Sequence, residues 1–409
     1  MAVTGVGVVS PLASDAERHF DALLGGRSGV GRCEPDAARL LELLGWARVR
    51  ELDRRAQVRT RMLRKVLRPA ALYAVVAAGE ALAQAELEPH GPQLFDGGLF
   101  VGSAGVEADS ALFFPAIATS LDRQGRFDLA LFARRGRRQV DPLVIVKGLP
   151  NAGLCGVAIE HGVRGPNLNL SGICAGPHAL ISAYASVRSG RTRLALAGGY
   201  DSRCTVDLVA VHRHAGELSD TVADAGLGAR PFDRRRDGFV PGEGAAFCVL
   251  EPEHLARRRG VRPLAIIEDA RRSCCSAADG AERSRALASL LSALAGPRPD
   301  LVFATGAAGR DSDVVEAQAI RAAWSSSPEV TATTGATGFL GAAHGILSFV
   351  HACQSLARGQ VPPTLGCEQP EPALGVPVIA DTHARPCDRA VVLAGHSQHQ
   401  LAVSLRSAE

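Results

Sequence analysis

Short runs of apolar and β-branched residues alternate along the chain with longer stretches rich in Ala and Leu, which is typical of an α/β protein. The first run predicts a strand over Val3–Val9 that ends in a Ser-Pro turn. An Ala- and Leu-rich stretch predicts one long amphipathic helix from Thr60 to Leu87. The pattern predicts further strands and helices over Leu99–Val101, Asn167–Leu170, Pro177–Ser189, Leu194–Ala197, Leu264–Ile267, Leu301–Ala304, Gly345–Arg358, Ala390–Ala394 and Leu401–Leu405.

The charged segment Glu251–Arg262 interrupts the apolar pattern and predicts a boundary between two unequal halves, 1–250 and 251–409. Pattern alone indicates the α/β class and does not show whether the two halves repeat one fold. No apolar run of 18 residues occurs, so we expect no membrane span. The N-terminal segment lacks the basic start of a signal peptide, so we expect a cytoplasmic protein.

Composition excludes several classes of function. The chain has 409 residues, 46% of them hydrophobic, which is enough to bury a large core, and its net charge of +3 gives no sign of a nucleic-acid partner. Its ten cysteines include no C-x-x-C pair, and no phosphate-binding G-x-x-x-x-G-K-[ST] loop is present, so we expect no metal or organic cofactor. The only lysines, Lys65 and Lys147, exclude any mechanism that needs a lysine in the second half.

Cys174 is the candidate nucleophile. The segment Asn-Leu-Asn-Leu-Ser-Gly-Ile-Cys-Ala-Gly-Pro-His, beginning at Asn167, predicts a strand, a Ser-Gly turn and then a helix. A thiol at the start of a helix faces unpaired N–H groups and the positive end of the helix dipole, and both favour the thiolate. The alternative is a small buried side chain in a strand-to-helix turn.

This segment resembles the active-site region of β-ketoacyl synthases, in which a strand leads to a Cys-Ala pair and a helix. The opening Val-Thr-Gly-Val-Gly-Val-Val-Ser-Pro-Leu and the segment Arg-Pro-Phe-Asp-Arg-Arg-Arg-Asp-Gly-Phe-Val-Pro-Gly-Glu-Gly over 230–244 also match family motifs. The resemblance covers the whole chain. It implies the α/β thiolase fold, with five αβαβα layers built from two similar halves and dimerisation across the central sheets.

The resemblance also implies that the basic residues of condensing members are missing. Those members use two histidines and a lysine to stabilise the carbanion that loss of CO₂ leaves. In register with their motifs, Thr305 and Phe339 stand at the histidine positions and Thr334 stands at the lysine position. The next histidine, His344, is expected to point into a helix.

The family's Gly-Phe-Gly-Gly-x-Asn loop, which gates the pocket and contributes to the oxyanion hole, is replaced by Gly395, His396, Ser397 and the three residues that follow. Side chains now occupy positions where glycine gave the backbone freedom. His396, His399 and His178 are the histidines that could act as a substitute base, and the alternative for each is a packed or solvent-facing side chain.

A chain with this pattern is expected to be a chain-length factor, the ketosynthase beta subunit of a type II polyketide synthase. Such subunits pair with a catalytic ketosynthase alpha subunit and share an acyl tunnel whose depth sets product length. By family analogy, the small residues Ala152, Gly153 and Gly156 would lie near the dimer interface and the tunnel floor. The alternatives are a stand-alone acyltransferase that uses Cys174 without decarboxylation, and a purely structural homologue.

An acyl carrier protein is the second expected partner. Its acidic recognition helix would suit the basic cluster that contains Arg61, Arg64 and Lys65. A second run of arginines follows at 134–138. The alternative for both is a solvated helix face, which is the commoner role of such charge runs.

Overall fold

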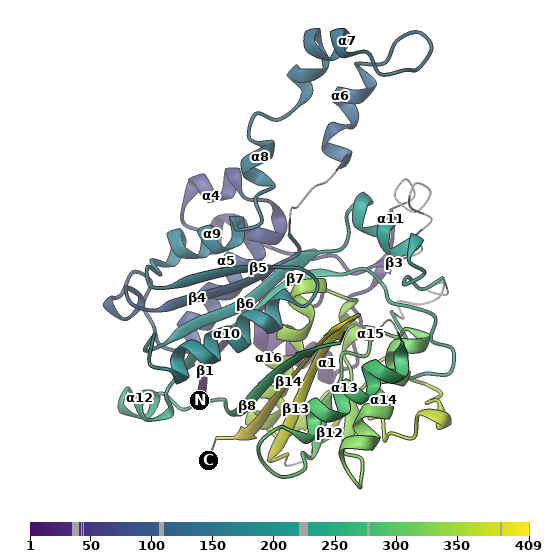
Figure 1. Cartoon of the computed structure of the whole chain (residues 1–409). Coiled ribbons are helices and arrows are strands. Elements are labelled where there is room, and N and C mark those ends of the chain that lie inside the picture. Colours follow the sequence, from purple (N-terminus) through teal and green to yellow (C-terminus); the bar gives the residue numbers. More distant parts are fainter. Residues whose placement is uncertain are drawn as a thin grey trace.

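The computed structural model describes residues 1–34, 41, 43, 45–105, 110–220, 228–275, 279–384 and 387–408. Ten strands form one sheet in the order β10-β9-β13-β14-β8-β1-β7-β6-β4-β5 (Figure 1). The strands are β1 (Ala2–Val9), β4 (Gly98–Ser103), β5 (Asn167–Ser171), β6 (Ala195–Ser202), β7 (Glu243–Glu251), β8 (Ala265–Cys274), β9 (Leu301–Phe303), β10 (Glu329–Thr331), β13 (Arg389–His396) and β14 (His399–Ser407).

The two halves of the sheet repeat one pairing pattern. From its free edge, the first half runs β5, β4 and β6 in parallel, then β7 and β1 antiparallel. The second half runs β10, β9 and β13 in parallel, then β14 and β8 antiparallel. Only two residue pairs, between β1 and β8, join the halves. The two similar halves expected of the thiolase fold are therefore present, whereas the exact division at residue 250 stays a prediction.

Helices cover the sheet in layers (Figure 1). Helices α5 (Pro69–Gln84) and α9 (Ala152–His161) pack on the outer face of the first half, and α13 (Gly280–Ser292) and α14 (Arg310–Ala323) cover the second half. Helices α10 (Ala175–Arg188) and α16 (His344–Arg358) lie between the halves and pack against each other. The resulting order of helix, sheet, helix, sheet and helix is the five-layered arrangement that the resemblance implied.

Shorter elements connect these layers and are α1 (Ala16–Leu24), β2 (Gly31–Arg32), β3 (Gly45–Trp46), α3 (Arg54–Gln57), α4 (Arg61–Val66), η1 (Pro92–Leu94), η2 (Ser110–Phe113), α6 (Phe114–Ala118), α7 (Leu129–Arg134), η3 (Gly136–Gln139), α8 (Val144–Lys147), α11 (Val206–His214), α12 (Glu253–Arg258), α15 (Thr334–Thr337), η4 (Gly341–Ala343), β11 (Gln360–Val361), η5 (Pro372–Leu374) and β12 (His383–Ala384). No helix within the described ranges is long and apolar enough to cross a membrane.

The single helix predicted from Thr60 to Leu87 is wrong, because the chain forms α4 and α5 with a break between them. Leu67 and Arg68 adopt extended conformations, with ψ of 141° and 162°. Pro69 follows them, and the proline ring disfavours helical geometry in the residue before it. Nor is α5 amphipathic: it is buried on most sides because it packs between the sheet and α9.

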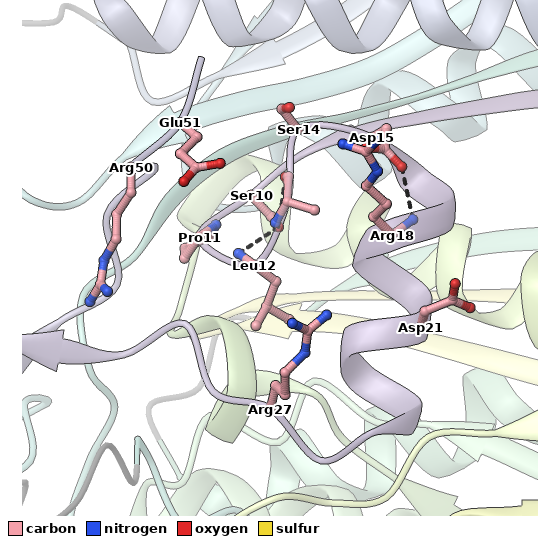
Figure 2. A pocket seen from close by; sticks show the side chains of 11 residues that line it. Ser10, Pro11, Leu12, Ser14, Asp15, Arg18, Asp21, Arg27, Arg50 and Glu51 are labelled. Atoms are coloured by element: carbon pink, nitrogen blue, oxygen red, sulfur yellow. Dashed lines mark hydrogen bonds and ion pairs between the residues drawn. The ribbon is translucent and has the colours of Figure 1, made fainter.

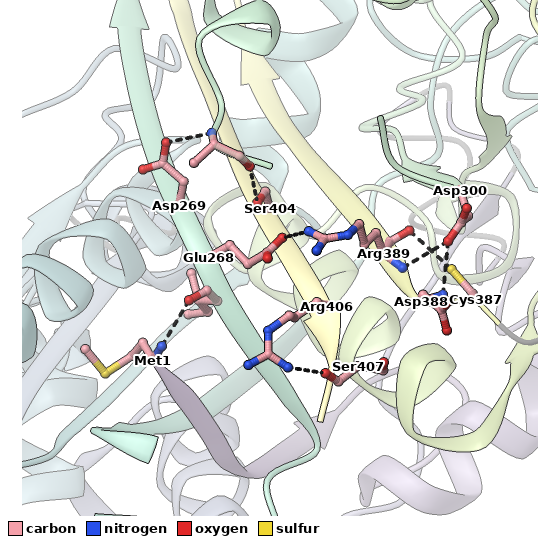
Figure 3. Close-up of polar contacts among 12 residues, drawn as sticks. Met1, Glu268, Asp269, Asp300, Cys387, Asp388, Arg389, Ser404, Arg406 and Ser407 are labelled. Atoms are coloured by element: carbon pink, nitrogen blue, oxygen red, sulfur yellow. Dashed lines mark hydrogen bonds and ion pairs between the residues drawn. The ribbon is translucent and has the colours of Figure 1, made fainter. Parts of the chain in front are cut away.

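The other predicted elements are confirmed, most of them with longer bounds. α10 begins at Ala175, directly after Cys174. β8 extends to Cys274, well beyond the predicted end at Ile267, because β14 pairs with it along most of its length. Figure 3 shows how polar contacts fix the end of this half-sheet: the Asp300 carboxylate accepts the N–H groups of Asp388 and Arg389, each at 3.0 Å.

A helical arm, residues 110–149, stands away from the body (Figure 1). It comprises η2, α6, α7, η3 and α8, and no element was predicted there from sequence. Many large apolar side chains on it are exposed: Leu112, Phe113, Phe114, Ile117, Leu121, Phe127, Leu129, Leu143, Ile145, Val146 and Leu149. An isolated protein rarely exposes so many apolar groups together, so the arm is a candidate interaction surface.

Candidate active site

Cys174 lies at the strand-to-helix turn that the sequence predicted. Gly172, with a φ of 130° that L side chains rarely adopt, turns the chain between β5 and α10. Cys174 is the N-cap residue of α10. Its side chain is buried and packs with Ile181, Ala394 and Leu401.

Burial decides the protonation state of this thiol. It raises the pKa of Cys174 to about 12, while the backbone N–H of His396 and the charge of Arg203 act in the opposite direction with smaller effect. Burial therefore favours the protonated thiol, which agrees with the alternative of a small buried side chain. Its position at the start of α10 does not outweigh the loss of hydration.

Three residues predicted from the family motifs come together beside this turn. Thr305 follows β9, and Thr334 begins α15. The Thr334 hydroxyl donates to the Thr305 carbonyl at 3.0 Å, and the Gly395 N–H donates to Oγ1 of Thr305 at 3.1 Å. Both threonine side chains are buried. Neutral hydroxyls thus stand where the register predicted one family histidine and the family lysine.

Phe339, which the register predicted at the position of the other family histidine, is also buried, and it packs in an aromatic cluster. Its ring centroid lies 4.7 Å from that of Phe239, 4.9 Å from that of His344 and 6.2 Å from that of His396. The cluster fills this position with apolar surface.

His344 faces these residues. Its Nε2 lies 3.1 Å from the Thr305 carbonyl oxygen and 3.2 Å from Oγ1 of Thr334. It is the first residue of α16, and side chains in a helix tilt toward the N-terminus, which turns the ring back toward α15. Burial lowers the pKa of His344 to about 4, so the ring is neutral at physiological pH.

Two buried carboxyl groups anchor the segment after β9. Oε1 and Oε2 of Glu316 accept the N–H groups of Thr305 and Gly306 at 3.1 and 2.9 Å. The Asp313 carboxyl accepts the N–H of Phe232, in the 230–244 segment, at 2.8 Å. Burial raises the pKa of both groups, that of Asp313 to about 7. Their contacts indicate a structural role that fixes the position of Thr305.

The segment predicted to replace the family gating loop is a tight β-hairpin. β13 and β14 stay paired up to His396 and His399, and only Ser397 and Gln398 form the turn. Ser397 has a φ of 54°. The His396 ring contacts a carboxylate: its Nε2 lies 3.4 Å from Oε1 of Glu217. The other carboxylate oxygen of Glu217 lies 2.6 Å from Nδ1 of His212.

The other two candidate bases contact residues other than Cys174. Nδ1 of His399 lies 3.4 Å from Sγ of Cys274, and the His399 ring packs edge-on against His178 with centroids 5.4 Å apart. Nδ1 of His178 lies 3.4 Å from the Arg272 guanidinium. Whether any of these histidines acts as a base stays a prediction.

The cavity beside Thr305 is small. It measures about 40 Å³ and is bordered by Glu316, Gly395 and His396, but not by Cys174. A volume of this size holds about one water molecule, whereas sites for small ligands measure roughly 300–1,000 Å³. A ligand of that size therefore does not fit in this cavity.

A larger pocket of about 460 Å³ lies apart from this site, near the start of α1. Arg18, Arg27 and Arg50 alternate there with acidic side chains (Figure 2).

Family models match most of the chain. Residues 1–256 match the N-terminal domain of β-ketoacyl synthases, and residues 261–368 match the C-terminal domain. The chain belongs to the β-ketoacyl synthase family.

Relatives of this chain agree with that assignment. It is 27% identical to the 3-oxoacyl-[acyl-carrier-protein] synthase 2 of Synechocystis sp., over 90% of this chain and 88% of that protein. The corresponding enzyme of Vibrio cholerae is also 27% identical, over 92% and 91% of the two chains.

Solved structures show the same fold. The ishigamide ketosynthase/chain length factor superposes with a TM-score of 0.86 at 21% identity, covering 100% of this chain and 99% of that one. A type II polyketide synthase ketosynthase, AntDE, solved with its acyl carrier protein AntF, superposes with a TM-score of 0.80 at 22% identity and the same coverage.

The small residues of α9 pack against the ketosynthase's own side chains. A Cβ on Gly153 would lie 2.3 Å from the Tyr200 ring, and one on Gly156 would lie 2.7 Å from Leu67. Ala152 is buried in the same cluster of α5 and α9. These residues allow close packing within the chain, and a role in a tunnel stays a prediction.

The predicted carrier-binding residues lie on α4. Arg61 and Lys65 are exposed, while Arg64 is partly buried and donates to the carbonyl oxygens of Arg55 and Val58 at 3.3 and 3.2 Å. The exposed Arg54, Arg55 and Arg59 precede them in the chain. This arrangement leaves a positively charged surface that suits an acidic partner.

Proposed function

We propose that this ketosynthase homologue is a chain-length factor: it pairs with a catalytic ketosynthase alpha subunit, which elongates carrier-bound chains, and shapes the space into which they grow. The site supports this role because its geometry lacks what condensation requires. Decarboxylation of a malonyl thioester leaves negative charge that a catalyst must stabilise with aligned donors or cations.

The composition of the site is the observation on which the proposal rests. Thr305 and Thr334 are neutral and already hydrogen-bonded, and Phe339 is apolar. His344 is neutral because burial lowers its pKa to about 4, and Cys174 is protonated because burial raises its pKa to about 12. A partner that carries intact condensing residues would supply the chemistry.

The molecule offers a surface for such a partner. β5 lies at the end of the sheet and pairs only with β4 among the described strands, so its other edge is open. Asn167, Leu168 and Ser171 on this strand are exposed. An open strand edge commonly pairs with another chain, and the apolar arm defined above adds surface that association would bury. A related ketosynthase is the occupant we propose, because its own β5 edge would be complementary.

Co-expression with a candidate alpha subunit tests the proposal. We expect a stable heterodimer in which elongation with malonyl carrier requires both chains and survives Cys174→Ala in this one. Substitutions that line the shared tunnel should change product length. Elongation by this chain alone would refute the proposal, and a homodimer as the only assembly formed in the presence of the alpha subunit would do so as well.

The alternative is a transferase that passes an acyl group through Cys174 to an alcohol or an amine. Retention of the cysteine and the N–H of His396 facing its sulfur favour this activity. The protonated, buried thiol opposes it. A homodimer that is acylated at Cys174 by a carrier thioester would support the alternative. A cytoplasmic location and docking of an acyl carrier protein on α4 are part of both proposals.

A further inference from the structure

A second thiol lies at the rim of the site and differs from Cys174 in being exposed. Cys274 is the last residue of β8 and pairs across the ladder with His399, the first residue of β14. Its Sγ lies 3.4 Å from Nδ1 of His399. Among the described cysteines, only Cys155 and Cys274 are classed as exposed. Cys274 therefore combines access to solvent with an imidazole at hydrogen-bonding distance.

Neighbouring side chains orient the His399 ring and make the site electropositive. The His178 ring, from α10, meets His399 edge to face at an interplanar angle of 89°. Behind it, the Arg272 guanidinium lies 3.4 Å from Nδ1 of His178. Arg272 and Cys274 are two residues apart on β8, so both side chains project from the same face of the sheet, toward α10.

These contacts match the arrangement of a nucleophile, a base and a third group that orients the base. We propose that Cys274 and His399 form a second nucleophilic site, which accepts acyl groups from thioesters. This inference rests on the proposed function in one respect only, which is the choice of an acyl thioester as the electrophile.

The step is a transfer between two sulfur atoms. His399 takes the proton of the Cys274 thiol, and the thiolate attacks the thioester carbonyl carbon. The bond from that carbon to the sulfur of the acyl donor then breaks, and the departing thiolate takes the proton from His399. The products are a Cys274 thioester and a free thiol, so no oxidant or other reactant is needed.

Its position gives the site access that Cys174 lacks. Burial is the main cause of the raised pKa of Cys174, and the neighbouring Cys274 raises it further, which places the two thiols near each other. The hairpin that carries His399 also carries His396, whose N–H faces the Cys174 sulfur. An acyl donor in solvent would therefore meet Cys274 before it could reach the buried thiol.

Mass spectrometry of the purified protein tests this site. The protein is incubated with an acyl N-acetylcysteamine thioester, and acylation of each cysteine peptide is followed over time. Cys155 is the internal control, because it is exposed on α9 of the same molecule. We expect Cys274 to be acylated at least about tenfold faster than Cys155, and Cys274→Ser to abolish the modification there.

The His399→Asn variant tests whether His399 acts as a general base or only packs against Cys274. General-base catalysis contributes about 10²–10⁴-fold, so this variant should slow acylation of Cys274 by roughly 100-fold and shift its pH–rate profile to higher pH. His254→Asn, at an exposed histidine on α12, should change nothing.

Two results would overturn the inference: equal acylation of Cys155 and Cys274 in the unsubstituted protein, or a His399→Asn variant with an unchanged rate and pH profile. The first comparison needs no variant, so a misfolded mutant cannot obscure it. Heterodimer formation is scored separately, so a failure here is distinguishable from a failure of the proposed function.

Discussion

The arm gives the sharpest prediction about partner binding. Leu129 on α7 and Ile145 on α8 are 72% and 78% exposed. If the alpha subunit covers them, Leu129→Ala combined with Ile145→Ala removes apolar carbons that are in water in the free chain and buried in the complex. The variant should weaken the heterodimer and leave the fold of the free chain intact.

The magnitude follows from the exposed fractions. Each substitution deletes three carbons, and burial of a carbon contributes about 0.8 kcal/mol, so covering most of each side chain contributes about 2 kcal/mol. Together the pair should weaken association by about 3–4 kcal/mol, which is roughly a 150- to 800-fold increase in the dissociation constant.

Titration calorimetry or sedimentation velocity measures this change, and Val211→Ala serves as the matched control. Val211 is 60% exposed on α11, outside the arm. Because both arm residues are exposed in the free chain, its unfolding free energy should change by less than about 0.5 kcal/mol per site. A dissociation constant that changes no more than in the control would show that the partner does not cover the arm.

Three further changes test the site and its surroundings. Phe339→Ala should lower the unfolding free energy by about 3–5 kcal/mol in urea denaturation, since it empties a buried ring position; a loss below about 1 kcal/mol would contradict the packing described. Burial raises the pKa of Asp313 to about 7, so its carboxyl binds a proton more tightly in the folded chain and favours folding below about pH 4. Its contribution is lost as pH rises toward 7, so the stability of the unsubstituted chain relative to Asp313→Asn should fall across that window, and a constant difference would count against this reasoning. Replacing both Arg61 and Lys65 by Glu should weaken carrier binding and flatten its salt dependence; binding that is insensitive to salt in the unsubstituted chain would rule out electrostatic docking.

The sequence was sufficient for the scaffold because local signals and family motifs agree there. The strands with strongly apolar runs, such as Val3–Val9, appear as predicted, and Cys174 lies at the expected turn. The prediction of one helix over 60–87 was wrong because it relied on the apolar composition of the segment and gave too little weight to Pro69, the local signal for a break. The arm carries apolar residues that pack on nothing in this chain, so burial periodicity could not reveal it.

The chemistry of the site was only partly predictable. Aligning the sequence with the family motifs predicts that Thr305, Thr334 and Phe339 replace two histidines and a lysine. Which side chain then fills the space depends on tertiary packing, which the motifs do not show. His344 lay outside the motif and reaches the threonines only because α16 starts where it does. Burial of Cys174, which decides its protonation, likewise depends on Ala394 and Leu401, more than two hundred residues away in the chain.

The closed turn at Ser397 and Gln398 has a mechanical consequence for any acyl chain. A glycine-rich loop can swing aside at little cost, whereas moving His396 would require breaking backbone hydrogen bonds between β13 and β14. In an assembly of two related chains, this chain therefore presents a fixed boundary on its side, and the growing product would be loaded and released through the other subunit.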